Sequence, residues 1–118
     1  MATIAAALNG PTNDGIIEVL WEGLDTSNRD GSGVKLVNYP DKTVQVVGNF
    51  AGNADISIEG SNDGGTTWFE LRDSADAELG YLATGGDVIL ENPTLLRPIL
   101  ASGNGTTDID VYLVARAN

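Results

Sequence analysis

The 118-residue chain carries six Lys and Arg residues against seventeen Asp and Glu residues, a formal net charge of −11, and it has no His and no Cys. Without His, a Ser-His-Asp or Cys-His hydrolytic centre cannot be built, and a zinc site of the usual kind lacks its ligands. Six dispersed cations are too few for nucleic-acid phosphates, and the net charge repels an anionic membrane surface. We therefore expect no enzyme activity, no cofactor, no metal, no nucleic-acid partner and no membrane partner.

Hydrophobic residues make up 42% of the chain, which is enough for one folded core. A domain of this size buries roughly two-thirds of its unfolded surface, so it should fold without metal or disulfide support. The apolar run within residues 1–10 follows no basic residue and is too short for a secretory signal. No apolar stretch approaches the ~20 residues that span a bilayer. We expect synthesis in the cytoplasm without a signal peptide.

Short alternating runs separated by Gly, Asn and Asp, all residues that favour turns, dominate the sequence. The first run predicts a strand with Ile17, Val19 and Trp21 on one face. Its other face carries Glu18 and Glu22 alongside Leu20, so both faces are partly apolar. Residues 34–37 predict a second, less regular strand, and Pro40 then indicates a sheet edge or a turn at 39–42.

The middle of the chain shows clearer alternation. Residues 43–50 predict a strand with Val44 and Val46 on one face, and residues 55–61 answer it with Ile56 and Ile58 pointing inward. The polar residues expected to face water in this second strand are Asp55, Ser57 and Glu59. The Asp63-Gly-Gly sequence then predicts a hairpin turn into a strand at 67–72.

Periodicity fades across residues 73–86, which leaves room for a short extra strand there. Further strands are predicted at 87–91 and 95–101, and the most regular one lies near the C-terminus. It places Ile109, Val111, Leu113 and Ala115 on one side and Asp110, Tyr112, Val114 and Arg116 on the other.

About seven or eight short strands with this spacing are typical of an all-β protein with a single antiparallel β-sandwich, of jelly-roll or Ig-like kind. Residues 14–118 form the predicted sandwich domain. Residues 1–13 form a predicted N-terminal arm.

The acidic residues offer little catalytic or metal-binding chemistry. A glycosidase pair needs one carboxyl in a sheltered cleft, whereas most acids here fall in turns or on polar strand faces. The loop beginning at Asp25 is not an EF-hand, because Arg29 stands at the third ligand position and Leu36 at the twelfth.

Three groups of apolar residues are candidates for binding. Trp68 could stack on a sugar, although the favoured interpretation places both Trp21 and Trp68 in the core. The arm, with Ile4, Leu8 and Pro11, either lies on its own sheet or adds to the edge of a neighbour's sheet. The segment with Leu79, Tyr81 and Leu82 is either an exposed partner interface or a loop folded over the core.

Two stretches, residues 58–71 with the Ser61-Asn-Asp-Gly turn ahead of Trp68, and residues 96–116 with Arg97-Pro98, resemble a known family. They are similar to small β-sandwich capsid decoration (cement) proteins of tailed bacteriophages. The resemblance covers about the C-terminal two-thirds of the chain. Comparable turns also occur in discoidin-like and other sandwich modules that bind sugars.

The resemblance implies a non-enzymatic virion structural protein, made in the host cytoplasm, that sits on the capsid surface across junctions of the major capsid protein. By analogy it implies self-association, with a homotrimer preferred over a homodimer. The family supplies no catalytic residues. A carbohydrate-binding β-sandwich module, with Trp68 as its stacking residue, and a phage tail or baseplate subunit remain the alternatives.

Overall fold

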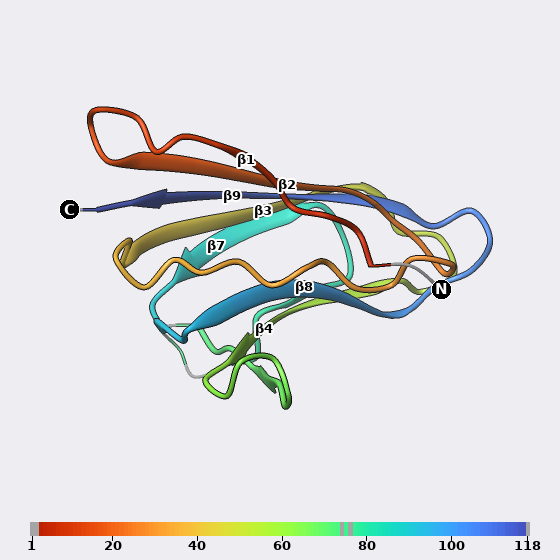
Figure 1. Ribbon diagram of the computed structural model, residues 1–118. Helices are drawn as coiled ribbons and strands as arrows, with labels where there is room; N and C mark the ends of the chain where they lie inside the picture. Colours follow the sequence, from red (N-terminus) through yellow and green to blue (C-terminus); the bar gives the residue numbers. More distant parts are fainter. Residues whose placement is uncertain (1–2, 74, 76, 118) are drawn as a thin grey trace.

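The computed structural model describes residues 3–73, 75 and 77–117, and it is a β-sandwich of two antiparallel sheets without a helix in this described part (Figure 1). The all-β sandwich predicted from the sequence is confirmed. The described residues form nine strands, namely β1 (Ala7–Asn9), β2 (Ile16–Leu24), β3 (Asp41–Asn49), β4 (Asp55–Ser61), β5 (Phe69–Glu70), β6 (Gly80–Tyr81), β7 (Gly85–Ile89), β8 (Leu95–Ser102) and β9 (Asp108–Arg116).

The two sheets differ in size and regularity. The first sheet has the order β1-β2-β9-β3-β7, with the last strand of the chain at its centre. In the second sheet β4 pairs along its length with β8, and it also pairs with the two-residue strands β5, at Glu59 and Gly60, and β6, at Ile56 and Ser57. Because β9 pairs with both β2 and β3, the middle of this sheet is formed by contacts between residues far apart in the sequence.

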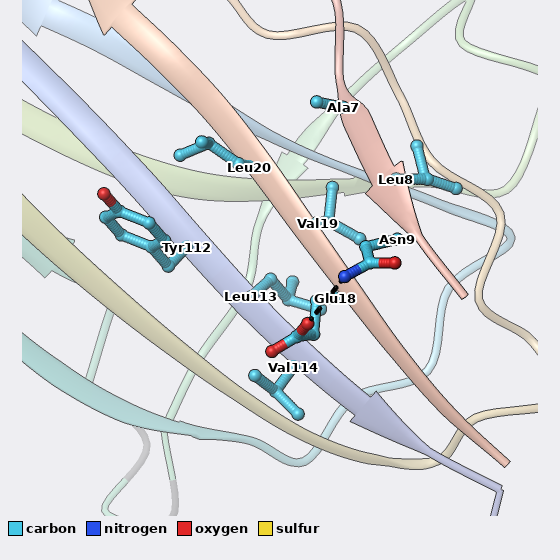
Figure 2. A pocket seen from close by; sticks show the side chains of 9 residues that line it. All are labelled: Ala7, Leu8, Asn9, Glu18, Val19, Leu20, Tyr112, Leu113 and Val114. Carbon is cyan, nitrogen blue, oxygen red and sulfur yellow. Dashed lines mark hydrogen bonds between the residues drawn. The ribbon is translucent and has the colours of Figure 1, made fainter. Parts of the chain in front are cut away.

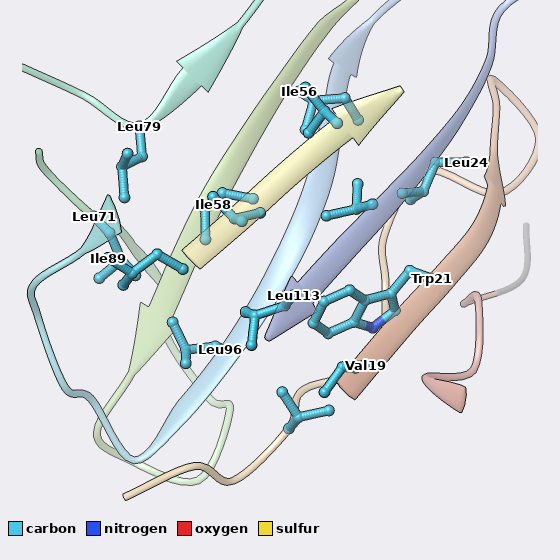
Figure 3. Packing of buried hydrophobic residues seen from close by; sticks show 14 of the residues in the cluster. Val19, Trp21, Leu24, Ile56, Ile58, Leu71, Leu79, Ile89, Leu96 and Leu113 are labelled. Atoms are coloured by element: carbon cyan, nitrogen blue, oxygen red, sulfur yellow. The ribbon is translucent and has the colours of Figure 1, made fainter. Parts of the chain in front are cut away.

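The core lies between the sheets and is built by the predicted alternation. In β9 the residues Ile109, Val111, Leu113 and Ala115 are all buried. Trp21 is 1% exposed, and its indole Nε1 donates to the backbone oxygen of Ser32 at 2.9 Å. Figure 3 shows side chains of both sheets, among them Val19, Ile58 and Leu96, meeting in this layer. Burial of each large apolar side chain contributes about 1.5–3 kcal/mol.

The N-terminal segment runs along the sandwich. The Ile4 amide donates to the Asp30 oxygen and the Ile4 oxygen accepts from the Ser32 amide, both at 2.8 Å. The chain then enters β1, which pairs with β2 of the first sheet. It leaves β1 through Gly10, whose φ is +111° and whose missing Cβ would lie 2.6 Å from a backbone oxygen. Part of the predicted arm is therefore a strand, which is one reason the strands number nine.

Several strand predictions need correction. The strand expected at 67–72 is only Phe69–Glu70, and the one expected at 34–37 is a single bridge between Val34 and Leu96. Ser57, predicted to face water, is buried because Glu70 of the adjacent strand covers it and accepts its hydroxyl at 3.1 Å. Glu59, also predicted to face water, is half-buried because the side chain of Arg97 contacts it.

Lys42, predicted to lie at an edge or turn, is fully buried inside β3. Its Nζ donates to Oδ1 of Asn92 at 3.0 Å and to the backbone oxygen of Pro40 at 3.3 Å. Desolvation lowers the pKa of this amine, and the nearby charge of Asp41 opposes that shift. The ammonium group thus ties the start of β3 to the connection between β7 and β8.

Candidate binding surface

The outward side of the first sheet carries an apolar surface across its middle. Cross-strand registers align two outward rows over all five strands. The first row runs Ala7, Leu20, Tyr112, Gln45, Gly86, and the second runs Asn9, Glu18, Val114, Thr43, Val88. We call the five apolar members Ala7, Leu20, Val88, Tyr112 and Val114 the Tyr112 face. Tyr112 is 41% exposed and Val88 is 46% exposed, so they are accessible to a partner.

This surface is hollowed on both sides of β9. One shallow groove is lined by residues of β1, β2 and β9, as Figure 2 shows. A second groove lies over β3, β7 and β9, and Tyr112 and Val114 line both. Gly86 lines the second groove, and a Cβ there would lie 2.8 Å from the Val44 backbone oxygen, so this position does not accommodate a side chain. The tyrosine ring is therefore a ridge between two depressions.

Acidic side chains surround the apolar surface. Glu18 accepts from Nδ2 of Asn9 at 3.2 Å, and Asp110 accepts from the Gly23 amide at 2.9 Å. Asp41 occupies the outward row beyond Thr43, opposite Arg116. Among the described residues, Arg116 is the only Lys or Arg at an outward register position of this sheet. The field over the Tyr112 face is thus negative.

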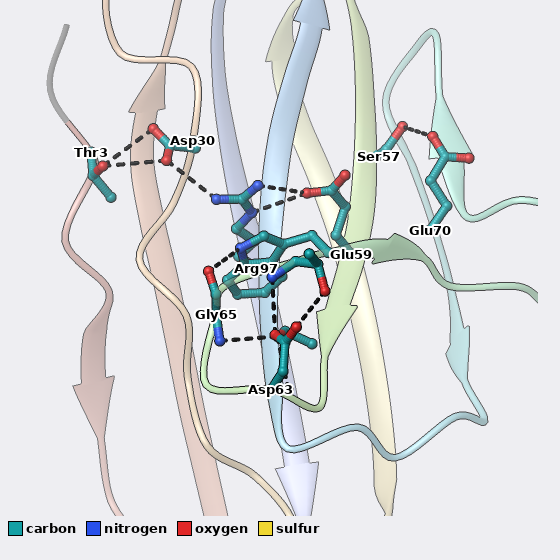
Figure 4. A network of polar contacts seen from close by, with 11 residues as sticks. Thr3, Asp30, Ser57, Glu59, Asp63, Gly65, Glu70 and Arg97 are labelled. Atoms are coloured by element: carbon teal, nitrogen blue, oxygen red, sulfur yellow. Dashed lines mark hydrogen bonds and ion pairs between the residues drawn. The ribbon is translucent and has the colours of Figure 1, made fainter.

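The outward side of the second sheet is different, because a cation there is fully engaged. The Arg97 guanidinium contacts Oε1 of Glu59 at 3.0 Å and Oδ2 of Asp30 at 3.4 Å (Figure 4). It also lies 4.1 Å from the ring centre of Trp68. Thr3 of the N-terminal segment donates to Asp30 at 3.3 Å. These interactions join β4, β8, the β5 hairpin and the N-terminal segment.

Trp68, the sugar-stacking candidate that the favoured interpretation placed in the core, belongs to this arrangement and not to the buried core. It is half-buried, one face of its ring lies against Arg97, and its Nε1 donates to the Gly65 oxygen at 3.1 Å. The neighbouring Phe69 is the more exposed aromatic, at 42%. The structure therefore gives Trp68 a visible structural role and leaves its proposed sugar contact as a prediction.

The turn that carries Trp68 is held by Asp63. Its carboxylate accepts from the Ser61 hydroxyl at 2.8 Å, from the Thr67 amide at 2.9 Å and from the Thr67 hydroxyl. These hydrogen bonds, the Thr67 hydroxyl above all, lower the pKa of Asp63 to about 2. The predicted hairpin signal thus corresponds to a turn in which a carboxylate replaces missing backbone partners.

The predicted arm residues occupy different surroundings. Ile4 is half-buried against the core, whereas Leu8 is 53% exposed and Pro11 is exposed in the turn before β2. The structure brings the arm onto its own sandwich. Partner binding by these three residues stays a prediction.

The predicted group of Leu79, Tyr81 and Leu82 does not form one exposed surface. Leu79 is 1% exposed and belongs to the core, Leu82 is 72% exposed, and Tyr81 lies between them in burial. The Tyr81 hydroxyl is buried and has no hydrogen-bond partner among the described residues. Desolvation, aided by the charges of Asp87 and Asp73, raises the pKa of Tyr81 to about 12. Only Leu82 of this group offers a large exposed apolar side chain.

One carboxyl pair occurs at the surface of the second sheet. Glu78 is exposed, and its hydrogen bond with Glu70 raises the pKa of Glu78. Glycoside hydrolysis needs one carboxyl in a sheltered cleft, and the exposed position of Glu78 does not provide that shelter. Within the described ranges, three or more potential ligands from His, Cys, Asp and Glu nowhere gather closely enough to hold a metal ion. No described helix is long and apolar enough to cross a membrane.

The Tyr112 face was not among the candidates chosen from the sequence. The sequence nevertheless contains an indication of it. Leu20 lies on the otherwise polar side of the first predicted strand, and Tyr112 and Val114 lie on that of the last. Recognising it as one surface requires knowing that β2, β7 and β9 belong to the same sheet. That order is set by long-range pairing.

Comparison with known proteins finds no matching family model, no matching curated protein and no matching solved structure.

Proposed function

We propose that this chain is a non-enzymatic structural protein of the virion that decorates and stabilises the outside of a tailed-phage capsid. The observation that carries the proposal is the Tyr112 face, an apolar surface at the centre of a sheet whose outward side would otherwise be expected to be polar. The resemblance of residues 58–71 and 96–116 to decoration proteins supports the same function. In this proposal the partner is the major capsid protein.

The proposed mechanism is linkage between binding and assembly. A protein that binds only the assembled lattice adds its binding free energy to the assembled state. Many copies, each with a modest interface, multiply the effect against the pressure of packaged DNA. The charge of −11 keeps unbound copies soluble and mutually repulsive.

Self-association over capsid junctions is part of the proposal, with a homotrimer preferred over a homodimer by analogy. Light-scattering mass of the purified protein measures this directly. A trimer mass supports the preferred state, and a stable monomer both free and on the capsid contradicts it.

The central experiment adds purified protein to capsids that lack it, followed by cryo-electron microscopy and heating. We expect new density on the outer capsid surface and a higher temperature of capsid disruption. Capsids without added density and without added heat resistance would exclude the proposal. Density on the tail instead of the head would favour the tail or baseplate alternative.

A carbohydrate-binding module is the second candidate, because the exposed ring of Tyr112 lies opposite Gln45 and shares one groove with Glu18. A glycan array with Trp68→Ala and Tyr112→Ala variants tests it. Glycan binding that either substitution abolishes without unfolding would favour this candidate over decoration.

A further inference from the structure

We propose that the Tyr112 face is the contact surface for the capsid partner, and that the partner segment it binds presents apolar side chains flanked by Lys or Arg. This inference rests on the decoration function and names the surface that performs it. It replaces neither the predicted arm nor Leu82 as additional contacts.

The Tyr112 face places apolar side chains on the solvent side of its sheet, where polar residues are expected. Strands of a sheet with one solvated side normally place polar residues outward, and Glu18, Thr43 and Gln45 in the same two rows follow this rule. Leu20, Tyr112 and Val114 depart from this rule on adjacent strands, where they form one surface. A cluster of this kind is typical of an interaction site, whereas scattered exposed apolar residues are ordinary.

The shape of the Tyr112 face also suits a protein partner. The two grooves on either side of β9 can each accept an apolar side chain, with the Tyr112 ring between them. Tyrosine at the centre of a contact supplies a large rigid surface and a hydroxyl that stays hydrogen-bonded at the margin. Gly85 and Gly86 of β7 line the second groove without adding side chains to it.

The charge around the Tyr112 face determines which kind of partner fits it. Glu18, Asp41 and Asp110 lie around the surface with Arg116 as the opposing cation. A second copy docked face to face would bring these acids against their own equivalents, in two chains of net charge −11. Like charges across an interface cost several kcal/mol, whereas a basic margin on the partner is attracted and guided toward the surface. The occupant is therefore a different protein with Lys or Arg beside its apolar anchors.

The test is co-sedimentation of the folded protein with capsids, comparing two exposed aromatic residues on opposite sheets. Tyr112→Ser should weaken capsid binding by tenfold or more, while Phe69→Ser should leave it within twofold. Circular dichroism and thermal unfolding check that each variant is folded. Val88→Lys, on the exposed edge strand, is the second variant: it places a cation beside the partner's cations and should also weaken binding by about tenfold.

The outcomes separate the two proposals. If wild-type protein does not bind capsids, the decoration function is excluded and the assignment of its surface falls with it. If wild type binds but Tyr112→Ser and Val88→Lys bind equally well, the function stands and this surface assignment is overturned. A lower solution mass for Tyr112→Ser than for wild type also overturns it, because the face would then join copies of this chain.

Discussion

The outward sides of the two sheets differ in whether the fold itself supplies contacts for their large side chains. On the second sheet, Arg97 engages two carboxylates and an aromatic ring that the fold itself supplies. On the first sheet, Tyr112 and its apolar neighbours have no such cover in the described chain, and acids surround them. The outward surface of the second sheet is therefore completed within the molecule, whereas that of the first sheet is suited to completion by a partner. Stability measurements should therefore respond to the first and binding measurements to the second.

The largest expected effect on stability comes from Arg97. Arg97→Met leaves Glu59 and Asp30 without their cation and removes the contact over Trp68, which should cost about 2–3 kcal/mol. Urea unfolding measures the change. Arg116→Met, at the exposed end of β9, is the matched control and should stay within about 0.5 kcal/mol. Equal losses in the two variants would remove the distinction between the sheets.

The next effect concerns capsid binding and its dependence on salt. Binding by wild type should weaken as ionic strength rises, because the acids around the Tyr112 face attract a basic partner. Glu18→Lys should weaken binding about tenfold at low salt, equivalent to about 1.4 kcal/mol. Glu78→Lys makes the same charge change on the other sheet and should have a smaller effect. Identical salt curves for the two variants would show that only net charge matters.

A smaller effect is expected where the sheets meet, at Tyr81. Its folded pKa of about 12 exceeds the ordinary value of 10, so its contribution is complete below pH 10 and is lost as pH rises toward 12. Tyr81→Phe should remove this alkaline loss. It should also raise stability at neutral pH by about 1 kcal/mol, since a buried hydroxyl without a partner disappears.

Titration of Lys42 has the opposite effect on the pH dependence of stability to that of Tyr81. The lowered pKa of Lys42 makes stability increase with pH over the window between its folded value and 10.5. Wild type and Tyr81→Phe share this contribution, so the difference between their urea unfolding curves isolates the tyrosine. A difference that stays constant from pH 9 to 12 would contradict the assignment.

The local pattern predicted the elements better than it predicted the surfaces. Period-two alternation placed Trp21 and Leu113 correctly in the core, because each strand has one buried side whatever its neighbours are. It could not place Ser57 or Lys42, whose burial depends on Glu70 and Asn92 from distant segments. The alternation also could not predict the contacts of Arg97, because Asp30 and Glu59 come close to it only through pairing of segments distant in the sequence.

The smallest expected effect lies in the turn that supports Trp68. The pKa of Asp63, about 2 in the fold against an ordinary 3.8, means that its contribution is present above pH 4 and is lost as pH falls toward 2. Asp63→Asn should make stability less sensitive to pH in that range and slightly lower at neutral pH. Asp14→Asn, in the exposed turn before β2, makes the same side-chain change away from this turn and is the control for the loss of one carboxylate. Thermal unfolding from pH 2 to 7 measures both. Because the Gly65 oxygen in this turn accepts from the Trp68 indole, near-ultraviolet circular dichroism of Asp63→Asn should also show a less ordered Trp68. An unchanged acid profile would mean that the second sheet depends on Arg97 alone and does not need its hairpin carboxylate.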